Sequence, residues 1–279
     1  MRAMLQAKRH MMILELLRQA HAVSIEEFKS RLNVSEMTVR RDLLELEKQG
    51  LLKRTFGGAI STSNAVIEPP YRTRGEENKE EKVAVGMRAA EFVEDGDCIY
   101  LDYGTTAERM ATFLRSKRKL TVVTASTGVA AELFAAEGVT VVITGGVLRH
   151  GEPSLVGPLT ERTLRDMYFH KAFIGVAGIE PASGITEYNL QEAEAKRIVI
   201  ERAKQVFLIA DHAKFGRVAF VRIGSLRSGW RVITDSGLDG SIEAGCQQLG
   251  VEIIRAQVSY RRTNETCPAA DPKESGSEV

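Results

Sequence analysis

Several apolar runs in the second half of the sequence end in small polar residues of the kind that bind phosphate. The candidate ligand-binding residues are Asp102, Gly104, Thr105, Thr106, Ser126, Thr127, Gly145, Gly146, Asp211 and Lys214. Glycine lets backbone N–H groups approach a ligand closely, and the start of a following helix favours an anion. Threonine hydroxyls add donors, and a lysine supplies a positive charge for phosphate. One Gly-Thr turn is usually only a turn, whereas three such turns and a lysine together predict a phosphate site.

The elements that must position these residues alternate regularly from Asp97 onward. The β-branched runs are CIYLD, LTVVTAS, VTVVITGG, KAFIGVAGI, QVFLIAD, RVITD and VEIIRA. Helical stretches such as AERMATFL and LQEAEAKRIVIERA separate them, which predicts βαβ units and a mostly parallel α/β sheet covered on both faces. Ligands bind outside the carboxyl ends of the strands in such sheets, so we expect the candidate residues at one rim.

The first sixty residues have a different pattern, that of a helix-turn-helix. Residues 5–20 favour a helix, although their apolar period is imperfect. Ser24 with Glu27 forms a capping box at the start of a second helix, and Ser35 is placed to cap a third. The short stretch RLNVS between the two caps predicts the turn of the motif, from about Val23 to Asp42.

The third helix has an apolar side and a polar side. Its apolar side carries Val39, Leu43 and Leu46. Thr38 and Arg41 lie opposite and are our candidates for base edges, since arginine matches guanine well. Arg40 lies on the flank, where it could clamp a phosphate or pair with a carboxylate. An isolated Arg-Arg pair in a helix would more often be merely solvated.

The next stretch, LLKRTFGGAIST, predicts two strands joined by a Gly-Gly turn. A basic hairpin after a recognition helix is the wing of a winged helix-turn-helix, placed beside the DNA backbone. Residues 1–61 are therefore the predicted DNA-binding domain. Its candidate DNA-binding residues are Ser35, Thr38, Arg40, Arg41, Lys53, Arg54, Gly57 and Gly58.

The signature S-x-x-T-x-R-R-D-L followed by R-x-x-G-G-A closely resembles the N-terminal domain of the DeoR family of bacterial regulators. The matching residues are Ser35, Thr38, Arg40, Arg41, Asp42, Leu43, Arg54, Gly57, Gly58 and Ala59. Roughly residues 78–235 also resemble the DeoR-type sensor domain, whose fold is shared with ribose-5-phosphate isomerase. That likeness rests on D-x-G-T-T at 102–106, T-G-G at 144–146, S-x-x-G at 154–157, F-I-G at 173–175 and D-x-x-K at 211–214.

The resemblance implies a phosphorylated sugar effector that changes the affinity for DNA. Carried over to this sequence, it implies that Gly104, Thr105 and Thr106 take the phosphate, and that Asp211 and Lys214 serve the response to the effector. It suggests a transcriptional repressor of a sugar-metabolism operon. We expect a dimer or tetramer, because helix-turn-helix proteins usually pair across repeated half-sites.

An enzyme is the main alternative, as an isomerase or deaminase. Isomerases with this fold resemble one another in an acid-rich D-G-A-D-E-type stretch, whose counterpart here, GVAGIEP, keeps only Glu180. His212 beside Asp211 could be a base but is more often a loop histidine. Glu187, Glu192 and Glu194 could touch sugar hydroxyls or could serve as cap and solvated residues. We therefore expect no enzyme. A second alternative is that the C-terminal part of the chain only binds another protein. A protein interface, however, would not need three glycine-containing turns at one rim of the sheet.

Length and charge support two domains. The 279 residues carry a net charge of +1, but residues 1–60 hold a net +4 and the remainder a net −3. A basic DNA-binding module joined to a ligand-binding domain would show this asymmetry. The expected division is 1–61 for DNA binding, 62–77 for a linker, 78–258 for the sensor and 259–279 for a disordered tail.

The remaining features favour a cytoplasmic protein without a cofactor. The three cysteines, Cys98, Cys246 and Cys267, form no C-x-x-C pair, so neither a disulfide nor a metal site is expected. No apolar run approaches the roughly 18–20 residues that cross a bilayer, and the N-terminus lacks a signal peptide, so we expect no contact with a membrane.

Overall fold

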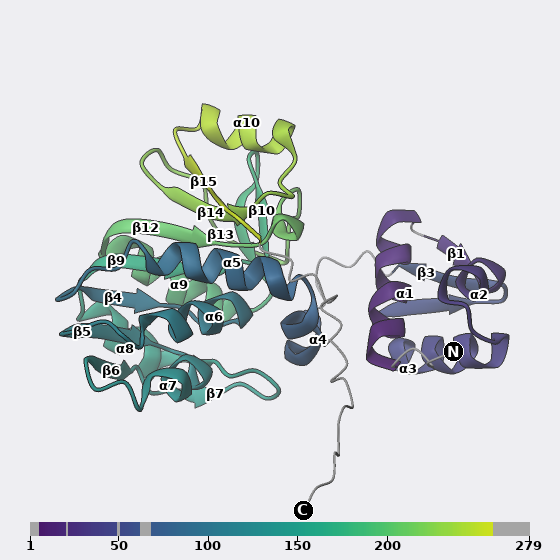
Figure 1. Cartoon of the computed structure of the whole chain (residues 1–279), viewed down its shortest axis with the longest axis horizontal. Coiled ribbons are helices and arrows are strands. Elements are labelled where there is room, and N and C mark those ends of the chain that lie inside the picture. The colour runs from purple at the N-terminus through teal and green to yellow at the C-terminus, as the bar shows by residue number, and fades with distance from the viewer. Residues whose placement is uncertain (1–5, 21, 49–50, 62–67, 259–279) are drawn as a thin grey trace, which may run out of the picture.

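The computed structural model describes residues 6–20, 22–48, 51–61 and 68–258. Figure 1 shows the N-terminal part in purple and the larger α/β part in teal to yellow. We call residues 6–61 the head and residues 68–258 the body. The expected tail at 259–279, and residues 62–67 of the expected linker, lie outside the described residues.

The head is a winged helix-turn-helix, as predicted. Its elements are α1 (Gln6–Ala20), β1 (Ala22–Ser24), α2 (Ile25–Leu32), α3 (Glu36–Lys48), β2 (Leu52–Thr55) and β3 (Gly58–Ser61). The three strands form one antiparallel sheet in the order β1-β3-β2, and β2 and β3 are the wing.

Local signals explain why the head folds in this way. The Ser24 hydroxyl accepts a hydrogen bond from the Glu27 amide at 3.1 Å, which caps α2. Asn33 ends that helix in the left-handed conformation, with φ of 52°. The Ser35 hydroxyl then accepts from the Thr38 amide at 3.3 Å. The apolar faces of the three helices meet in one core that includes Phe28, which is fully buried.

All seven predicted runs of the body form strands of one parallel sheet. They are β4 (Cys98–Leu101), β5 (Leu120–Thr124), β6 (Val139–Ile143), β9 (Phe169–Ile174), β12 (Ala203–Ile209), β14 (Arg231–Asp235) and β15 (Glu252–Ala256). Their order is β15-β14-β12-β9-β4-β5-β6, and every neighbouring pair is parallel. The strands β4, β9 and β12 therefore occupy the centre of the sheet.

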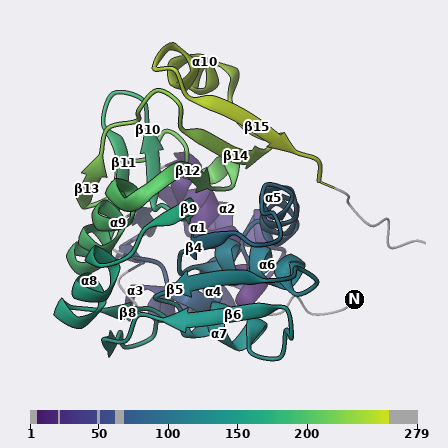
Figure 2. The same ribbon diagram turned by 90° about the vertical axis from the view of Figure 1, so that its left-hand side faces the viewer.

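Helices cover both faces of this sheet. Figure 2 shows α5 (Lys79–Ala90) and α6 (Thr105–Leu114) on one side, and α8 (Pro158–Arg165) and α9 (Leu190–Arg202) on the other. Successive side chains of a strand point to opposite faces of the sheet and so belong to different hydrophobic cores. In β4, Ile99 and Leu101 pack with α5 and α6, whereas Tyr100 packs with α9. The helices α7 (Thr127–Leu133) and α10 (Gly240–Gln248) complete the body.

Three features of the body were not predicted. A second, antiparallel sheet consists of β10 (Gly178–Glu180), β11 (Gly184–Glu187) and β13 (Val221–Gly224). A short hairpin pairs β7 (Val147–Leu148) with β8 (Leu155–Val156). The third feature is α4 (Tyr71–Glu76), which lies within the expected linker of residues 62–77. The described part of that segment therefore belongs to the body.

Candidate functional site

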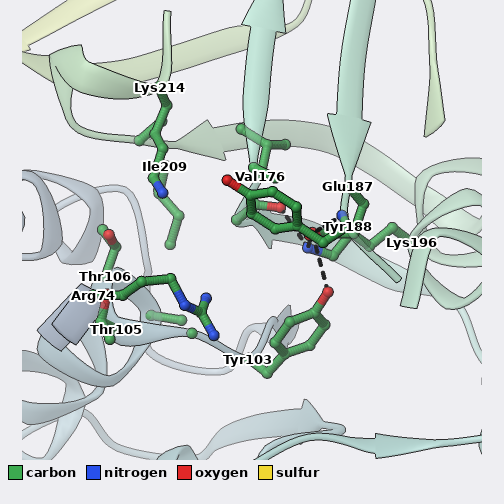
Figure 3. Close-up of a pocket in the computed structure, with 15 residues that line it drawn as sticks. Arg74, Tyr103, Thr105, Thr106, Val176, Glu187, Tyr188, Lys196, Ile209 and Lys214 are labelled. Carbon is green, nitrogen blue, oxygen red and sulfur yellow. Dashed lines mark hydrogen bonds and ion pairs between the residues drawn. The ribbon is translucent and has the colours of Figure 1, made fainter. Parts of the chain in front are cut away.

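A pocket opens at the carboxyl ends of the central strands β4, β9 and β12. Figure 3 shows the side chains that line it. Those used below are Arg74, Tyr103, Gly104, Thr105, Thr106, Glu187, Lys196 and Lys214. The pocket has a positively charged end, near Thr105, Thr106 and Lys214, and an end with buried carboxylates near Tyr103.

The first end is built on the start of α6. The first backbone N–H groups of a helix have no partner within the helix, and they carry partial positive charge. Gly104 precedes Thr105 with φ of 111°, a conformation that favours glycine, and a Cβ there would meet nothing within 4 Å. Thr105 and Thr106 add hydroxyls beside these amides. This end of the pocket is suited to an anion.

Lys214 adds a full positive charge to the same end. It stands at the end of η1 (His212–Lys214), and in Figure 3 its ammonium group points toward Thr106 and Arg74. Within the described parts of the chain, this ammonium group makes no hydrogen bond or ion pair, although the backbone amide of Lys214 donates to the Asp211 carbonyl. Burial lowers its pKa below the ordinary lysine value, and the nearby carboxylate of Asp211 offsets this only in part. A half-buried ammonium without a partner is what an incoming anion would neutralise.

Asp211 lies behind this lysine rather than in the pocket. Its Oδ1 accepts hydrogen bonds from the Asn78 side chain at 2.9 Å and from the Ala213 amide at 3.1 Å. Its Oδ2 lies 3.9 Å from Lys82 Nζ. Burial alone would raise the pKa of Asp211, but Lys214 and Lys82 bring it below the ordinary value. Asp211 therefore stays ionised and holds the loop that carries Lys214.

The opposite end of the pocket contains a buried cluster around Lys196. Its Nζ lies 3.1 Å from Asp102 Oδ2, and it donates hydrogen bonds to Glu187 and, at 2.7 Å, to the Gly175 carbonyl. The same ammonium lies 4.3 Å from the centre of the Tyr103 ring, and the Tyr103 hydroxyl donates to Glu187 at 3.1 Å. Each hydrogen bond fixes the direction of a group that borders the pocket.

Both Glu187 and Lys196 are ionised. Burial by itself would lower the pKa of Lys196, but Asp102 and Glu187 raise it well above the ordinary value. Burial would likewise raise the pKa of Glu187, yet Lys196 keeps it below the ordinary value. The three N–H groups of Lys196 face oxygens of Asp102, Glu187 and Gly175, so a ligand hydroxyl at this end would donate to the charged carboxylate of Glu187.

Six of the ten expected ligand residues lie at or directly behind this pocket, and four do not. Ser126 caps α7, accepting from the Val129 amide at 3.1 Å, and the Thr127 amide donates to Pro153 at 2.8 Å. Gly145 and Gly146 pack against the start of α8. The reason is the strand order: β5 and β6 lie at one edge of the sheet, away from its centre. Asp102 is fully buried beneath the pocket as a partner of Lys196.

The sequence also gave no role to two pocket residues. Arg74 lies in the expected linker, residues 62–77. Lys196 does carry a signal, because it stands on the apolar side of α9 with Ala193 and Ile200, and all three are buried. A lysine within an apolar stripe indicates a buried charge that needs carboxylate partners.

The candidate DNA-binding residues of the head divide into paired and unpaired groups. Arg40 forms an ion pair with Glu36 at 2.7 Å, and Arg54 forms one with Glu47 at 2.7 Å. Arg41 and Lys53 are exposed, and their side chains have no ion pair or hydrogen bond among the residues that the structure describes. Their positive charges are therefore available to a nucleic acid.

Other parts of the signature are structural. Asp42 is fully buried and accepts hydrogen bonds from Arg9 at 2.7 and 3.0 Å, which ties α3 to α1. A Cβ on Gly58 would lie 2.1 Å from the Val23 carbonyl oxygen, so β3 requires glycine there. A Cβ on Gly57 would meet nothing within 4 Å, and its φ is not positive. The fold itself does not require glycine at 57.

No cluster of three or more His, Cys, Asp or Glu side chains that could hold a metal ion occurs among the described residues. None of the helices in the described ranges combines the length and apolar character needed to cross a bilayer.

Comparison with known proteins identifies both parts of the chain. Residues 9–65 match the DeoR-like helix-turn-helix domain, and residues 77–236 match the DeoR C terminal sensor domain. The HTH-type transcriptional regulator YulB of Bacillus subtilis is 37% identical, over 92% of this chain and 100% of that protein. The glycerol-3-phosphate regulon repressor of Escherichia coli is 35% identical, over 84% of this chain and 92% of that one.

A further relative is the HTH-type transcriptional regulator GlpR of Haloferax volcanii, 35% identical over 90% of this chain and 98% of that protein. A solved structure of ribose 5-phosphate isomerase A from Methanocaldococcus jannaschii is a much looser match, with a TM-score of 0.37 and 18% identity over 50% of this chain and 55% of that one. With both of its domains matched and its relatives aligned over most of its length, the chain belongs to the DeoR family of DNA-binding transcriptional regulators.

Proposed function

We propose that the pocket of the body binds a phosphorylated sugar or polyol, and that this ligand controls the affinity of the head for DNA. The chain is a regulator and not an enzyme, and its relatives include the glycerol-3-phosphate regulon repressor and a putative aga operon transcriptional repressor, both of Escherichia coli. The proposal extends this role to a repressor whose state depends on a sugar-phosphate effector. It acts in the cytoplasm, where DNA and phosphorylated sugars are both present.

The observation that carries the proposal is the unpaired ammonium of Lys214 beside the start of α6. A phosphate placed there would receive hydrogen bonds from backbone amides after Gly104 and from the hydroxyls of Thr105 and Thr106. At the other end of the pocket, the carboxylate of Glu187 would accept hydrogen bonds from the sugar hydroxyls. The name of one relative, a glycerol-3-phosphate regulon repressor, supports a small phosphorylated polyol.

For the head, we propose that α3 enters the major groove with Thr38 and Arg41 at base edges. Lys53 and the wing turn at Gly57 would contact the backbone, as would Ser35, Arg40 and Arg54. Arg40 and Arg54 would first have to exchange their carboxylate partners for phosphate. The regulator would bind repeated half-sites as a dimer or tetramer.

A thermal-shift screen tests the effector site. The purified chain is heated with glycerol 3-phosphate, other phosphorylated sugars and their unphosphorylated counterparts. A ligand at about 100 times its dissociation constant adds roughly 2.7 kcal/mol of stability. We expect a shift only with phosphorylated compounds, lost in Lys214→Ala and kept in Lys204→Ala, which changes an exposed lysine of β12. If no phosphorylated sugar stabilises the wild type, the body binds something else, such as a protein partner.

A further inference from the structure

Arg74 belongs both to the pocket and to the segment through which the body continues toward the head. Its side chain lines the pocket from α4. Its Nη2 lies 3.0 Å from Glu68 Oε1, and its Nε donates a hydrogen bond to the Pro69 carbonyl at 3.0 Å. The guanidinium therefore fixes residues 68–70, which directly follow residues 62–67 between head and body.

A second carboxylate from the body shares this guanidinium. Glu152, in the loop between β7 and β8, forms an ion pair with Arg74 Nη2. The Arg74 side chain is only 12% exposed, so water screens these contacts weakly. Burial raises the pKa of Glu152 and the Arg74 charge brings it partly back. Arg74 is thus surrounded by two carboxylates in a site of restricted solvent access.

Arg149 extends the same network. Its Nη2 lies 2.8 Å from Glu68 Oε2, and its Nη1 lies 2.6 Å from Glu192 Oε1, to which the Ser154 hydroxyl also donates at 2.6 Å. Three carboxylates, Glu68, Glu152 and Glu192, therefore share two guanidinium groups. Burial raises the pKa of both Glu152 and Glu192, because an ionised carboxylate is costly in this site, and a phosphate arriving beside Arg74 would bring a further negative charge to the network.

We propose that the guanidinium of Arg74 binds Glu68 of segment 68–70 when the pocket is empty and the phosphate of the effector when the pocket is filled. The phosphate and Glu68 therefore compete for Arg74. This inference rests on the proposed function, because it assigns a regulatory role within the same pocket. The phosphate offers a guanidinium two parallel hydrogen bonds, and Lys214 and the start of α6 favour the phosphate at that position. When Arg74 turns to the ligand, segment 68–70 loses the Glu68 ion pair and the bond to Pro69 together.

The coupling is reciprocal. Any state of the protein that keeps Glu68 on Arg74 weakens effector binding by the same factor by which the effector weakens that state. A repressor whose heads are held on DNA through a fixed segment 68–70 would therefore release them as the pocket fills. Arg74 binds the ligand in one state and positions the segment in the other.

The test uses two carboxylate variants and one control in the full chain. Glu68→Gln removes the competing charge from segment 68–70, and Glu152→Gln removes it from the body. Glu76→Gln changes an exposed carboxylate on the same short helix that pairs loosely with Lys79. Calorimetry with glycerol 3-phosphate and with inorganic phosphate measures the dissociation constants. Amide hydrogen exchange within residues 68–76 measures how firmly the segment is held; Pro69 and Pro70 have no amide hydrogen, so the signal comes from Glu68 and from α4, where the Arg74 amide donates to the Pro70 carbonyl at 3.0 Å.

Both Glu68→Gln and Glu152→Gln should bind the anions at least fivefold more tightly, the low end of ordinary coupling between sites. Glu76→Gln should stay within about twofold of the wild type. Exchange in residues 68–76 should speed up when ligand binds the wild type. In the absence of ligand it should already be faster in Glu68→Gln, but not in Glu152→Gln.

Two negative results have different meanings. If phosphate compounds bind the wild type while exchange in residues 68–76 is unchanged, or if Glu68→Gln binds no more tightly, the sharing of Arg74 is wrong and the sensor pocket stands. If no phosphorylated compound binds the wild type or any variant, the proposed function itself fails, and this inference fails with it.

Discussion

Replacing Lys196 by methionine tests how the pocket is held together. Methionine keeps an unbranched side chain only one atom shorter than lysine, but removes the charge from between Asp102 and Glu187. Lys196 is 1% exposed and Asp102 is fully buried, so water cannot replace the lost partner. Breaking a buried ion pair costs about 3–5 kcal/mol, because the remaining charge is left uncompensated. With two carboxylates affected, we expect a loss near the upper end of this range at pH 7.

The loss should depend on pH. In the wild type Lys196 keeps the pKa of Glu187 below its ordinary value, so the stability from Glu187 is fully present above the unfolded pKa and falls only in acid. In the variant the pKa of Glu187 rises instead, and the folded form binds a proton that the unfolded form does not. If a carboxylate is protonated in the folded variant at every pH between 7 and 5, the free energy of unfolding recovers by about 1.4 kcal/mol for each pH unit of acidification. The recovery between pH 7 and pH 5 is then about 2.7 kcal/mol.

Urea unfolding measures this directly. Trp230 is the only tryptophan of the sequence and is buried in the body, so its fluorescence follows the body and not the head. Lys204→Met, at an exposed position of β12, should change the free energy of unfolding by no more than about 0.5 kcal/mol. An equal loss at both pH values, or a loss below about 1 kcal/mol in Lys196→Met, would contradict the assignment of Lys196 as the compensating charge.

Two further predictions concern the head. Gly58→Ala should destabilise the head, because the new Cβ would lie 2.1 Å from a backbone oxygen of β1. Gly57→Ala should leave the thermal unfolding of the head unchanged, because a Cβ there meets nothing within 4 Å. It should still weaken DNA binding, because the wing turn at Gly57 is proposed to contact the DNA backbone. Equal melting temperatures for the two variants would refute this. Arg41→Ala should cost about 1–3 kcal/mol in binding to a duplex selected from a random pool, measured by fluorescence anisotropy. Arg40→Ala should cost less, since Arg40 first gives up its ion pair with Glu36; an equal loss would show that this pair is irrelevant to binding.

The sequence was a good guide wherever the information is local. The cap at Ser24 depends on neighbours a few residues away, and the structure confirms its hydrogen bond. The seven β-branched runs, each bounded by helical stretches, also became the seven strands of the parallel sheet. Periodicity and capping act within one element or between consecutive elements, so they can be read from the order of residues.

Strand order could not be predicted in this way, and for that reason the expected ligand residues include four that lie away from the pocket. The pattern of alternating strands and helices does not say that β9 and β12 insert between β4 and β14. Gly145 and Gly146 end a strand at the edge of the sheet, whereas Gly104 ends one at its centre. Arg74 and Lys214 meet at one pocket although 139 residues separate them, because packing of the whole body brings them together. Such contacts leave no periodic trace.

The ion pair between Glu187 and Lys196 also determines what kind of signal the pocket can report. Both groups keep their charges across the range in which histidine titrates, because each moves the pKa of the other away from neutrality. A ligand whose hydroxyls bind this pair therefore neither takes up nor releases a proton there. Acidification of the cell would therefore leave the contacts between the ligand hydroxyls and this end of the pocket unchanged.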